Sequence, residues 1–312
     1  MRKPWRSLGA WGLAAVVFSA AASSPKPQAP SPKPQAPSPT PQAPSPTPQA
    51  PSRIISLIPA VTEMLFAIGA GEAVVGVSSF DRYPPEARER PSVGGLIDPD
   101  FERILALRPD LVAAYGTQAD LIQRLERARV PVFPYQHAGL PDITVTLRRL
   151  GERVGRKAQA DRLADEIEGR LASLRARTSG RPKPRTMLVF EREPGTLRGM
   201  YTSGNVGFLA DMLAIAGGEN AFADVNRQSL QITAELVLAR APEVIVELRS
   251  QPGWTADRLA RERDVWRALS AVPAVRTKRI YILTDEMISI PGPRVADATL
   301  ALARVLHPDV FR

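Results

Sequence analysis

The stretch Gly155–Thr178, which reads GRKAQADRLADEIEGRLASLRART, decides the fold. Its apolar side chains recur at helical spacing, with charged residues between them: Leu163, Ile167, Leu171 and Leu174, with Ala160 and Ala164 beside them. This periodicity predicts one amphipathic helix of about six turns over residues 155–178. Such a helix is too long to join neighbouring strands of one sheet. We therefore expect it to join two lobes, with a ligand cleft between them.

The two halves that flank this helix, residues 53–154 and 179–312, show the same alternation of strand and helix patterns. Short β-rich runs in both halves are each followed by a helical pattern: Arg53–Leu57, Val74–Val77, Asp110–Tyr115, Met187–Phe190, Val244–Leu248 and Arg279–Leu283. Alternation of this kind predicts parallel sheets covered by helices. The expected fold class is α/β, with two Rossmann-like lobes joined by one long helix.

A short internal similarity supports two related lobes. Glu102 begins ERILALRPDLV and Glu235 begins ELVLARAPEVI, with a proline seven residues after each glutamate. Asp100 and Thr233 precede these segments as helix N-caps. Each glutamate then lies in the first turn of a helix, where a carboxylate meets the positive end of the helix dipole.

The first 52 residues have a different composition from the rest. Basic residues precede an uncharged apolar run that ends in small residues, so residues 1–22 are predicted to be a cleaved secretory signal peptide. Residues 23–52 contain four heptads, two SPKPQAP and two SPTPQAP. A segment this rich in proline cannot bury a core and favours polyproline II, so we interpret it as a stalk.

Cysteine content and charge limit the classes of protein. The chain has no cysteine, so neither a disulfide framework nor a lipid anchor is expected, and export then predicts the periplasm. Five of the 41 basic residues precede residue 52, whereas all 32 acidic residues follow it, so residues 52–312 carry only +4. No dense basic run with aromatic residues occurs, and no nucleic-acid partner is expected. We expect a monomer.

Five stretches carry a resemblance to a known family: SLIPAVTEMLFAIG (56–69), GVSSFDRYPPEA (76–87), VGGLIDPDFERILALRPDLV (93–112), GGENAFAD (217–224) and PGPR (291–294). In this order and spacing, residues 53–310 resemble the substrate-binding proteins of ABC importers whose lobes are joined by a single helix. The resemblance is strongest to the corrinoid-binding members. It implies an ABC permease dimer at the inner membrane as partner, with Glu102 and Glu235 docking on it. A single linking helix also implies only small rotations of the lobes.

The cleft of such a protein is expected to be lined by loops at the carboxyl ends of the strands. Aromatic walls and a few polar groups would hold a large chelate. The candidate ligand-binding residues are those that these loops supply: Pro59, Phe80, Tyr83, Gly94, Gly95, Tyr115, Arg192, Tyr201, Ser229, Trp254, Asp285 and Arg294. Trp266 falls in a helical pattern and is expected in the core. Where corrinoid-binding members have tryptophans, this chain has Gly95, Tyr115 and Ser229, which makes the aromatic clamp thinner.

The expected ligand is a corrinoid. A ferric siderophore or haem is the alternative, because arginines could meet a negatively charged chelate: Arg82, Arg192, Arg198, Arg227 and Arg294. No bare metal ion is expected, since the chain has only two histidines. His307 precedes Pro308 at a helix end and is interpreted as a capping residue, and His137 as an ordinary loop residue.

Other classes of function have less support in the sequence. No nucleophile motif lies beside either histidine, and no phosphate-binding glycine motif follows a strand, so we expect neither an enzyme nor a resident cofactor. A stalked adhesion or structural protein of the cell envelope is the alternative from another class. A ligand that raises the melting temperature would separate a receptor from it.

Overall fold

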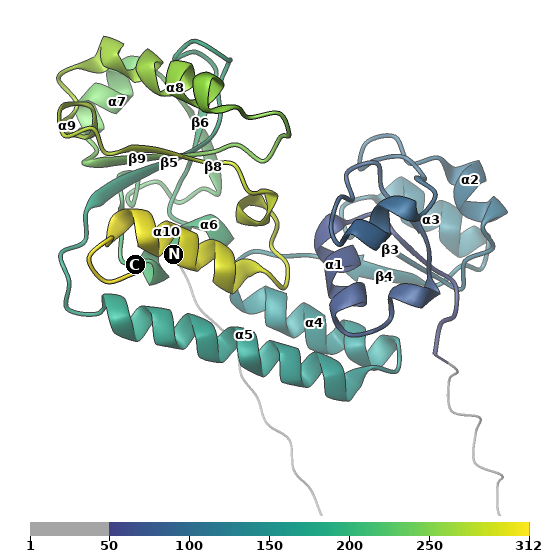
Figure 1. Ribbon diagram of the computed structural model, residues 1–312. Helices are drawn as coiled ribbons and strands as arrows, with labels where there is room; N and C mark the ends of the chain where they lie inside the picture. The colour runs from purple at the N-terminus through teal and green to yellow at the C-terminus, as the bar shows by residue number, and fades with distance from the viewer. Residues whose placement is uncertain (1–49, 312) are drawn as a thin grey trace, which may run out of the picture. The chain divides into compact units, whose positions relative to one another are not determined.

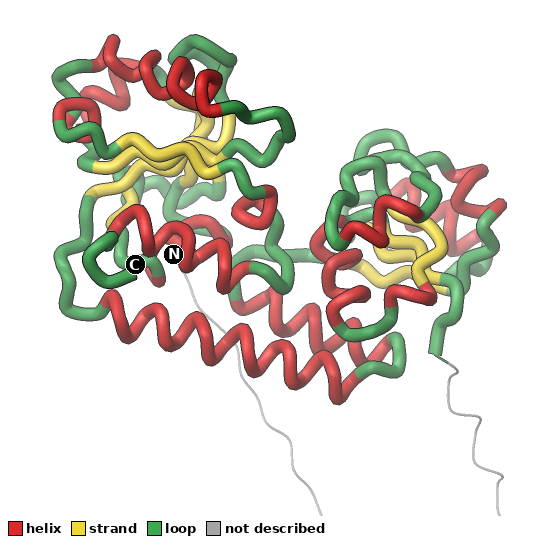
Figure 2. Tube along the Cα trace, viewed as in Figure 1, coloured by secondary structure: helices red, strands yellow, loops and turns green. Residues whose placement is uncertain are grey.

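The computed structural model describes residues 50–311, in which each half contains one β-sheet (Figures 1 and 2). The predicted signal peptide and nearly all of the predicted stalk lie outside the described residues. The first sheet has four strands in the order β2-β1-β3-β4. They are β1 (Ile54–Ser56), β2 (Val74–Val77), β3 (Leu111–Tyr115) and β4 (Val132–Tyr135). All of its pairings are parallel, as the sequence predicts.

Helices connect the strands of this first lobe. They are α1 (Pro59–Ala67), α2 (Phe101–Ala106) and α3 (Ala119–Arg127), with short 3₁₀ turns η1 (Gly71–Ala73) and η2 (Pro85–Glu89). The predicted cap of α2 is confirmed, since the Asp100 carboxylate accepts a hydrogen bond of 2.9 Å from the backbone N–H of Arg103. Each strand carries apolar residues that the helices cover, which makes the lobe a layered α/β unit.

The second sheet is mixed, which differs from the parallel sheet expected for this half. Its strands are β5 (Arg185–Glu191), β6 (Met200–Ser203), β7 (Glu219–Asn220), β8 (Ser229–Ile232), β9 (Val244–Leu248) and β10 (Ile280–Leu283). The order is β10-β9-β5-β6-β8, with β7 beside β5, and β6 runs antiparallel to both β5 and β8. Residues 192–199 form a hairpin connection that is too short for the crossover that parallel pairing requires.

The helices of the second lobe are α6 (Phe208–Ile215), α7 (Ala234–Arg240), α8 (Ala256–Asp264), α9 (Pro273–Arg276) and α10 (Val295–Leu306), with 3₁₀ turns η3 (Val265–Leu269) and η4 (Glu286–Ser289). The Thr233 hydroxyl caps α7 by accepting from the N–H of Leu236. Trp266 is fully buried, as predicted. His307 is the C-cap of α10, as predicted, and its backbone N–H donates to the carbonyl of Ala303. Its Nε2 also lies 3.2 Å from the carbonyl oxygen of Gly217, after α6.

The predicted linking helix is α5 (Lys157–Thr178), and a helix that the sequence did not reveal, α4 (Pro141–Arg153), packs antiparallel to it (Figure 1). Four of the six predicted apolar positions of α5 are buried, and Leu163 and Leu171 are partly buried against the same core. The two helices approach closely because Gly151 has no side chain. A Cβ at this position would lie 2.2 Å from the Cβ of Ala160.

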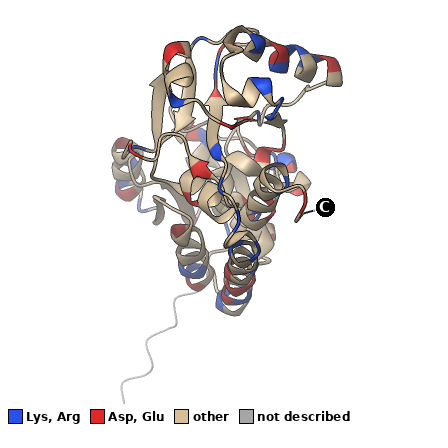
Figure 3. Ribbon diagram, turned by 90° about the vertical axis from the view of Figure 1, so that its left-hand side faces the viewer, with Lys and Arg blue, Asp and Glu red and all other residues tan. Residues whose placement is uncertain are grey.

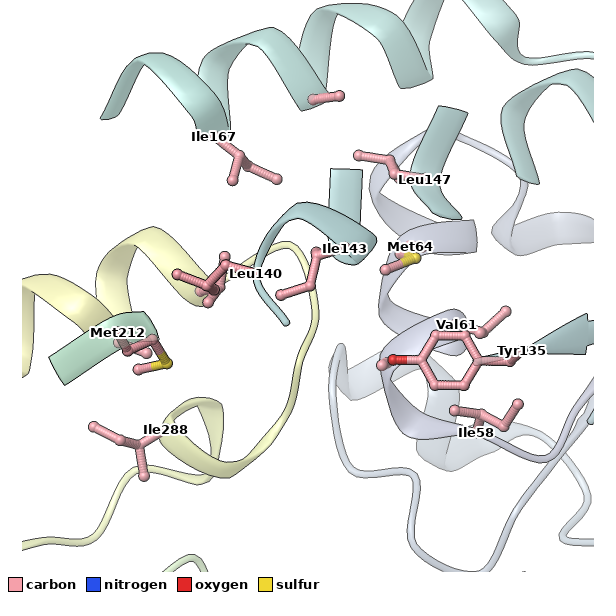
Figure 4. Packing of buried hydrophobic residues seen from close by; sticks show 14 of the residues in the cluster. Ile58, Val61, Met64, Tyr135, Leu140, Ile143, Leu147, Ile167, Met212 and Ile288 are labelled. Carbon is pink, nitrogen blue, oxygen red and sulfur yellow. The ribbon is translucent and has the colours of Figure 1, made fainter. Parts of the chain in front are cut away.

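The largest apolar core runs through α4 and belongs to both lobes (Figure 4). Val61 and Met64 come from α1, whereas Met212 comes from α6 and Ile288 from η4. Between them lie core residues of the segment that joins the lobes: Leu140, Ile143, Leu147 and Ile167. Burying each such side chain stabilises the fold by about 1.5–3 kcal/mol, so the lobes share an apolar joint as well as a connecting helix.

Acidic and basic residues are interspersed over the helices that Figure 3 shows, without a continuous basic face in that view. Several of them pair along or between helices, as Lys157 does with Asp161 at 2.6 Å. Within residues 50–311, no helix is both long enough and apolar enough to span a membrane.

Candidate functional site

The hollow surface of the second lobe lies at the carboxyl ends of β5 and β9. A cavity of about 650 Å³, which we call the Trp254 cavity, is lined by residues from the ends of both strands and from α8: Phe190, Arg192, Tyr201, Arg249, Trp254 and Arg258, among others. A second cavity of about 350 Å³, the His137 cavity, shares Phe190 and Ser250 with it. The two cavities therefore adjoin and form one extended hollow.

The first lobe presents apolar side chains after its own strand ends. Phe80 follows β2 and is 61% exposed, and Ile97 is 94% exposed. Gly95 lies against Phe80, since a Cβ there would come within 2.8 Å of the Phe80 ring. Phe80 and Ile97 thus lie exposed on the loops between β2 and α2.

The predicted ligand-binding residues lie in three parts of the structure: the two adjoining cavities of the second lobe, the loops of the first lobe, and a contact between the lobes. Arg192, Tyr201 and Trp254 line the Trp254 cavity, and Ser229 lines the His137 cavity. In the first lobe, Pro59 begins α1, Tyr115 ends β3 half-buried, and Gly94 and Gly95 form the loop beneath Phe80. Gly94 has a φ of +89° and adjoins the carbonyl of Asp98, which gives this glycine a structural reason of its own.

The remaining three predicted residues, Tyr83, Asp285 and Arg294, meet in a contact between the lobes. The Arg294 guanidinium lies 3.8 Å from the Tyr83 ring centroid and donates hydrogen bonds of 2.6 and 2.9 Å to the carboxylate of Glu63 on α1. Asp285 Oδ1 is 3.8 Å from the same guanidinium. Burial raises the pKa of Glu63, and the bonds from Arg294 oppose that rise. The charge of Arg294 is thus engaged within the protein.

Arg192 is also engaged, in a buried network behind the Trp254 cavity. Its side chain is 0% exposed and pairs with Glu247 at 2.9 Å and Glu262 at 2.7 Å. Glu247 further accepts from Arg249 at 2.9 Å and from the Trp266 indole N–H at 2.5 Å. This network fixes the cavity wall and leaves the Arg192 charge unavailable to an anionic ligand.

His137 is a cavity residue that sequence reasoning missed. It follows β4 by two residues, and its ring packs between those of Tyr135 and Phe208, with centroids at 5.4 and 5.9 Å. His137 lies in the loop between β4 and α4, as the sequence predicts, and this loop also lines the His137 cavity, which the sequence did not indicate. The sequence does contain one indication of this role: His137 follows the carboxyl end of a parallel strand, where ligands bind in α/β folds.

The segment that carries His137 also touches the second lobe before α4 begins. The backbone N–H of Leu140 donates to Asp211 on α6 at 2.9 Å.

Burial lowers the pKa of His137, and the nearby charge of Asp142 partly opposes this. The imidazole is therefore neutral at pH 7, the form that binds metals.

Glu102 and Glu235 are both exposed on the first turns of α2 and α7. In each lobe this helix lies on the side of the sheet away from α5 (Figure 1). A hydrogen bond from the Thr233 hydroxyl lowers the pKa of Glu235, which keeps this carboxylate ionised.

Within residues 50–311, no group of three or more histidine, aspartate or glutamate side chains is placed to hold a metal ion.

Two lobes, a joining helix and a hollow at the strand ends define a solute-binding protein. A model of the periplasmic binding protein family matches residues 54–287, and the chain belongs to this family. It is 32% identical over 256 residues to a vitamin B12-binding protein of Yersinia pestis, covering 77% of this chain and 88% of that protein. It is 29% identical over 267 residues to an uncharacterised ABC transporter substrate-binding lipoprotein of Bacillus subtilis, covering 83% of this chain and 81% of that protein.

Solved structures show the same fold. The periplasmic vitamin B12-binding protein of Vibrio cholerae superimposes with a TM-score of 0.72 at 26% identity, over 84% of this chain and 98% of that one. A periplasmic haem-binding protein from Roseiflexus gives a TM-score of 0.71 at 27% identity, over 84% and 99%. The fold class predicted from the sequence is confirmed, and the protein is a binding protein that works with an ABC importer.

Proposed function

We propose that this protein captures a corrinoid outside the cytoplasm and delivers it to an ABC importer. The observation that carries the proposal is the extended hollow at the ends of β5 and β9, where Phe190, Tyr201 and Trp254 provide aromatic surface. Aromatic side chains can cover the face of a large, flat macrocycle, while the charged groups of the same cavity can bind polar groups on its edge. Similarity to vitamin B12-binding proteins supports the corrinoid. The proposed role is capture and not catalysis.

Calorimetric titration of residues 50–312 with cyanocobalamin tests this function. We expect saturable binding of one ligand per chain, with a negative heat-capacity change because apolar surface is buried. Hemin and a ferric siderophore serve as comparison ligands. Binding of the siderophore alone would contradict the corrinoid proposal.

Haem is the second candidate, and His137 is the observation that favours it. A neutral imidazole within an aromatic cavity is a common axial ligand of haem iron. The cavity supplies Phe190 and Phe208 beside this ring. The similarity to a haem-binding protein supports the same candidate.

The His137→Ala variant distinguishes the two candidates. If haem is the ligand, loss of the axial ligand should shift the Soret band and weaken hemin binding at least about tenfold, which corresponds to about 1.4 kcal/mol. If a corrinoid is the ligand, His137 contributes only ring contacts at one end of the hollow, so cyanocobalamin affinity should fall by no more than about threefold, less than the loss expected for hemin. His307→Asn, at the end of α10, is the matched histidine control for both ligands.

Docking on the importer is proposed to use Glu102 and Glu235. Reversal of either charge, by Glu102→Lys or Glu235→Lys, should reduce ligand uptake by cells at least about tenfold, because charge-assisted contacts orient the encounter. Ligand affinity in solution should not change, since both residues are exposed outside the two cavities. The control Glu166→Lys, on the exposed face of α5, should leave uptake intact. Normal uptake by both docking variants would remove this role.

The first 52 residues are proposed to determine where the protein acts. The predicted signal peptide at residues 1–22 directs the chain to the periplasm, and the chain has no cysteine through which a lipid could be attached. The proline-rich residues 23–52 act as a spacer, and the mature protein acts as a monomer.

A further inference from the structure

The wall of the Trp254 cavity contains hydrogen-bonding groups that the protein itself leaves unpaired. The Trp254 Nε1 atom is buried and has no partner among residues 50–311. The Arg258 guanidinium stacks on the Trp254 ring, 3.9 Å from its centroid, and donates only a long hydrogen bond of 3.5 Å to the Gly253 carbonyl within residues 50–311. A buried N–H without a partner costs free energy, so the site calls for an acceptor from a ligand.

The other charges of this wall are balanced within the described residues. Arg192 and Arg249 pair with Glu247, and Arg192 also pairs with Glu262. Glu193 pairs with Arg198 at 3.2 Å. Arg258 and Glu191 are the two lining charges that no ion pair within residues 50–311 engages. The cavity therefore offers N–H donors at Trp254 and Arg258 and a carboxylate acceptor at Glu191.

We infer that the Trp254 cavity is a subsite for primary carboxamide groups on the rim of the bound macrocycle. This inference rests on the proposed function. A carboxamide carries an oxygen that accepts and an NH₂ that donates, so it can satisfy both kinds of group in this wall. A carboxylate could accept from Trp254 and Arg258, but it has no donor for Glu191 and would be repelled by that negative charge.

The two candidate macrocycles differ in the groups on their rims, so a carboxamide subsite would distinguish between them. The rim of a corrin carries neutral carboxamides, whereas the rim of haem carries carboxylates. A cavity that holds both an unpaired carboxylate and unpaired N–H donors is satisfied in full by an amide-bearing ring, whereas an acid-bearing ring would leave Glu191 unpaired. The groups that would make this selection, Glu191, Trp254 and Arg258, all belong to the second lobe.

Ligands that differ by one group test the inference. Cyanocobalamin is titrated by calorimetry against each of its monocarboxylic acids, in which one rim carboxamide has been hydrolysed. We expect at least one acid to bind about tenfold more weakly than cyanocobalamin, since a hydrogen bond is replaced by repulsion. Glu191→Gln, which keeps an acceptor oxygen and removes the charge, should reduce that penalty to less than about threefold. Acids that all bind as well as cyanocobalamin would overturn the inference.

A second variant tests the donor side. Trp254→Phe keeps a ring for Arg258 to stack on and removes only the N–H, so cyanocobalamin should bind about three- to tenfold more weakly. Arg261→Gln, which lies on α8 with Arg258 and is exposed outside both cavities, is the control and should bind normally. Unchanged binding by Trp254→Phe overturns this inference and leaves the proposed function intact. No cobalamin binding by the unaltered chain overturns the proposed function, and the inference with it.

Discussion

Replacing Glu247 with glutamine should lower the free energy of unfolding by about 3–5 kcal/mol, the cost of breaking a buried ion pair by removing one partner. Glu247 is 0% exposed and accepts hydrogen bonds from Arg192, Arg249 and Trp266. Glutamine has nearly the same volume, so packing is preserved while the buried Arg192 and the partly buried Arg249 lose their shared counter-charge, and Arg192 keeps only Glu262.

Thermal unfolding measures this effect directly. A loss of this size should lower the melting temperature by roughly 10 °C in a protein of this length. The control is Glu219→Gln, which removes a carboxylate that is 55% exposed and lies 3.6 Å from Arg185. An exposed pair contributes at most about 1 kcal/mol. A melting temperature within 2 °C of the unaltered protein for Glu247→Gln would show that the network is not needed for stability.

Arg294→Ala should destabilise the protein by about 3 kcal/mol, because it leaves the buried Glu63 carboxylate without its partner. The pair joins α1 of the first lobe to the start of α10 in the second, and Glu63 is only 2% exposed in its side chain. The loss should therefore weaken the coupling between the lobes as well as the fold of either one. Denaturant unfolding should change from one transition to two.

The double variant Glu63→Met with Arg294→Met separates charge from packing. Removing both charges leaves no unpaired group, so this variant should recover most of the lost stability. Arg170→Ala is the matched control, because Arg170 pairs with Asp297 where both side chains are at least 40% exposed. If Arg294→Ala destabilises no more than Arg170→Ala, the contact between the lobes contributes little.

Local patterns predicted the elements that depend on nearby residues. The spacing of Leu163, Ile167, Leu171 and Leu174 predicted α5, and the caps at Asp100 and Thr233 lie where the sequence placed them. These features need only helical periodicity and one side-chain oxygen. Strands β6 (MYTS) and β8 (SLQI) were not predicted, because two cycles of alternation in β8 and none in β6 are too weak a pattern to stand out.

The site was harder to predict because its contacts join distant residues. Arg294 and Glu63 are 231 positions apart, and no local pattern relates them. Glu247 did leave a signal, since it stands in the apolar strand VIVEL, where a buried charge requires a partner. The position of Arg192 after β5 predicts a ligand-binding residue, but in the structure its guanidinium pairs with Glu247.

The shared core and the Arg294 contact add to what the linking helix implies for motion. A receptor whose lobes meet through α4, α5 and a buried ion pair should bind its ligand with small changes in the angle between the lobes. Binding should therefore order the loops of the cavities more than it moves the lobes.

Hydrogen exchange of residues 50–312, with and without saturating cyanocobalamin, tests the central claim most directly. The account predicts protection in the loops that line the two cavities, around residues 136–139, 190–207 and 249–254, with no change in α3 or α9. Protection confined to surfaces outside these loops, or no protection at all, would contradict a corrinoid site at the ends of β5 and β9.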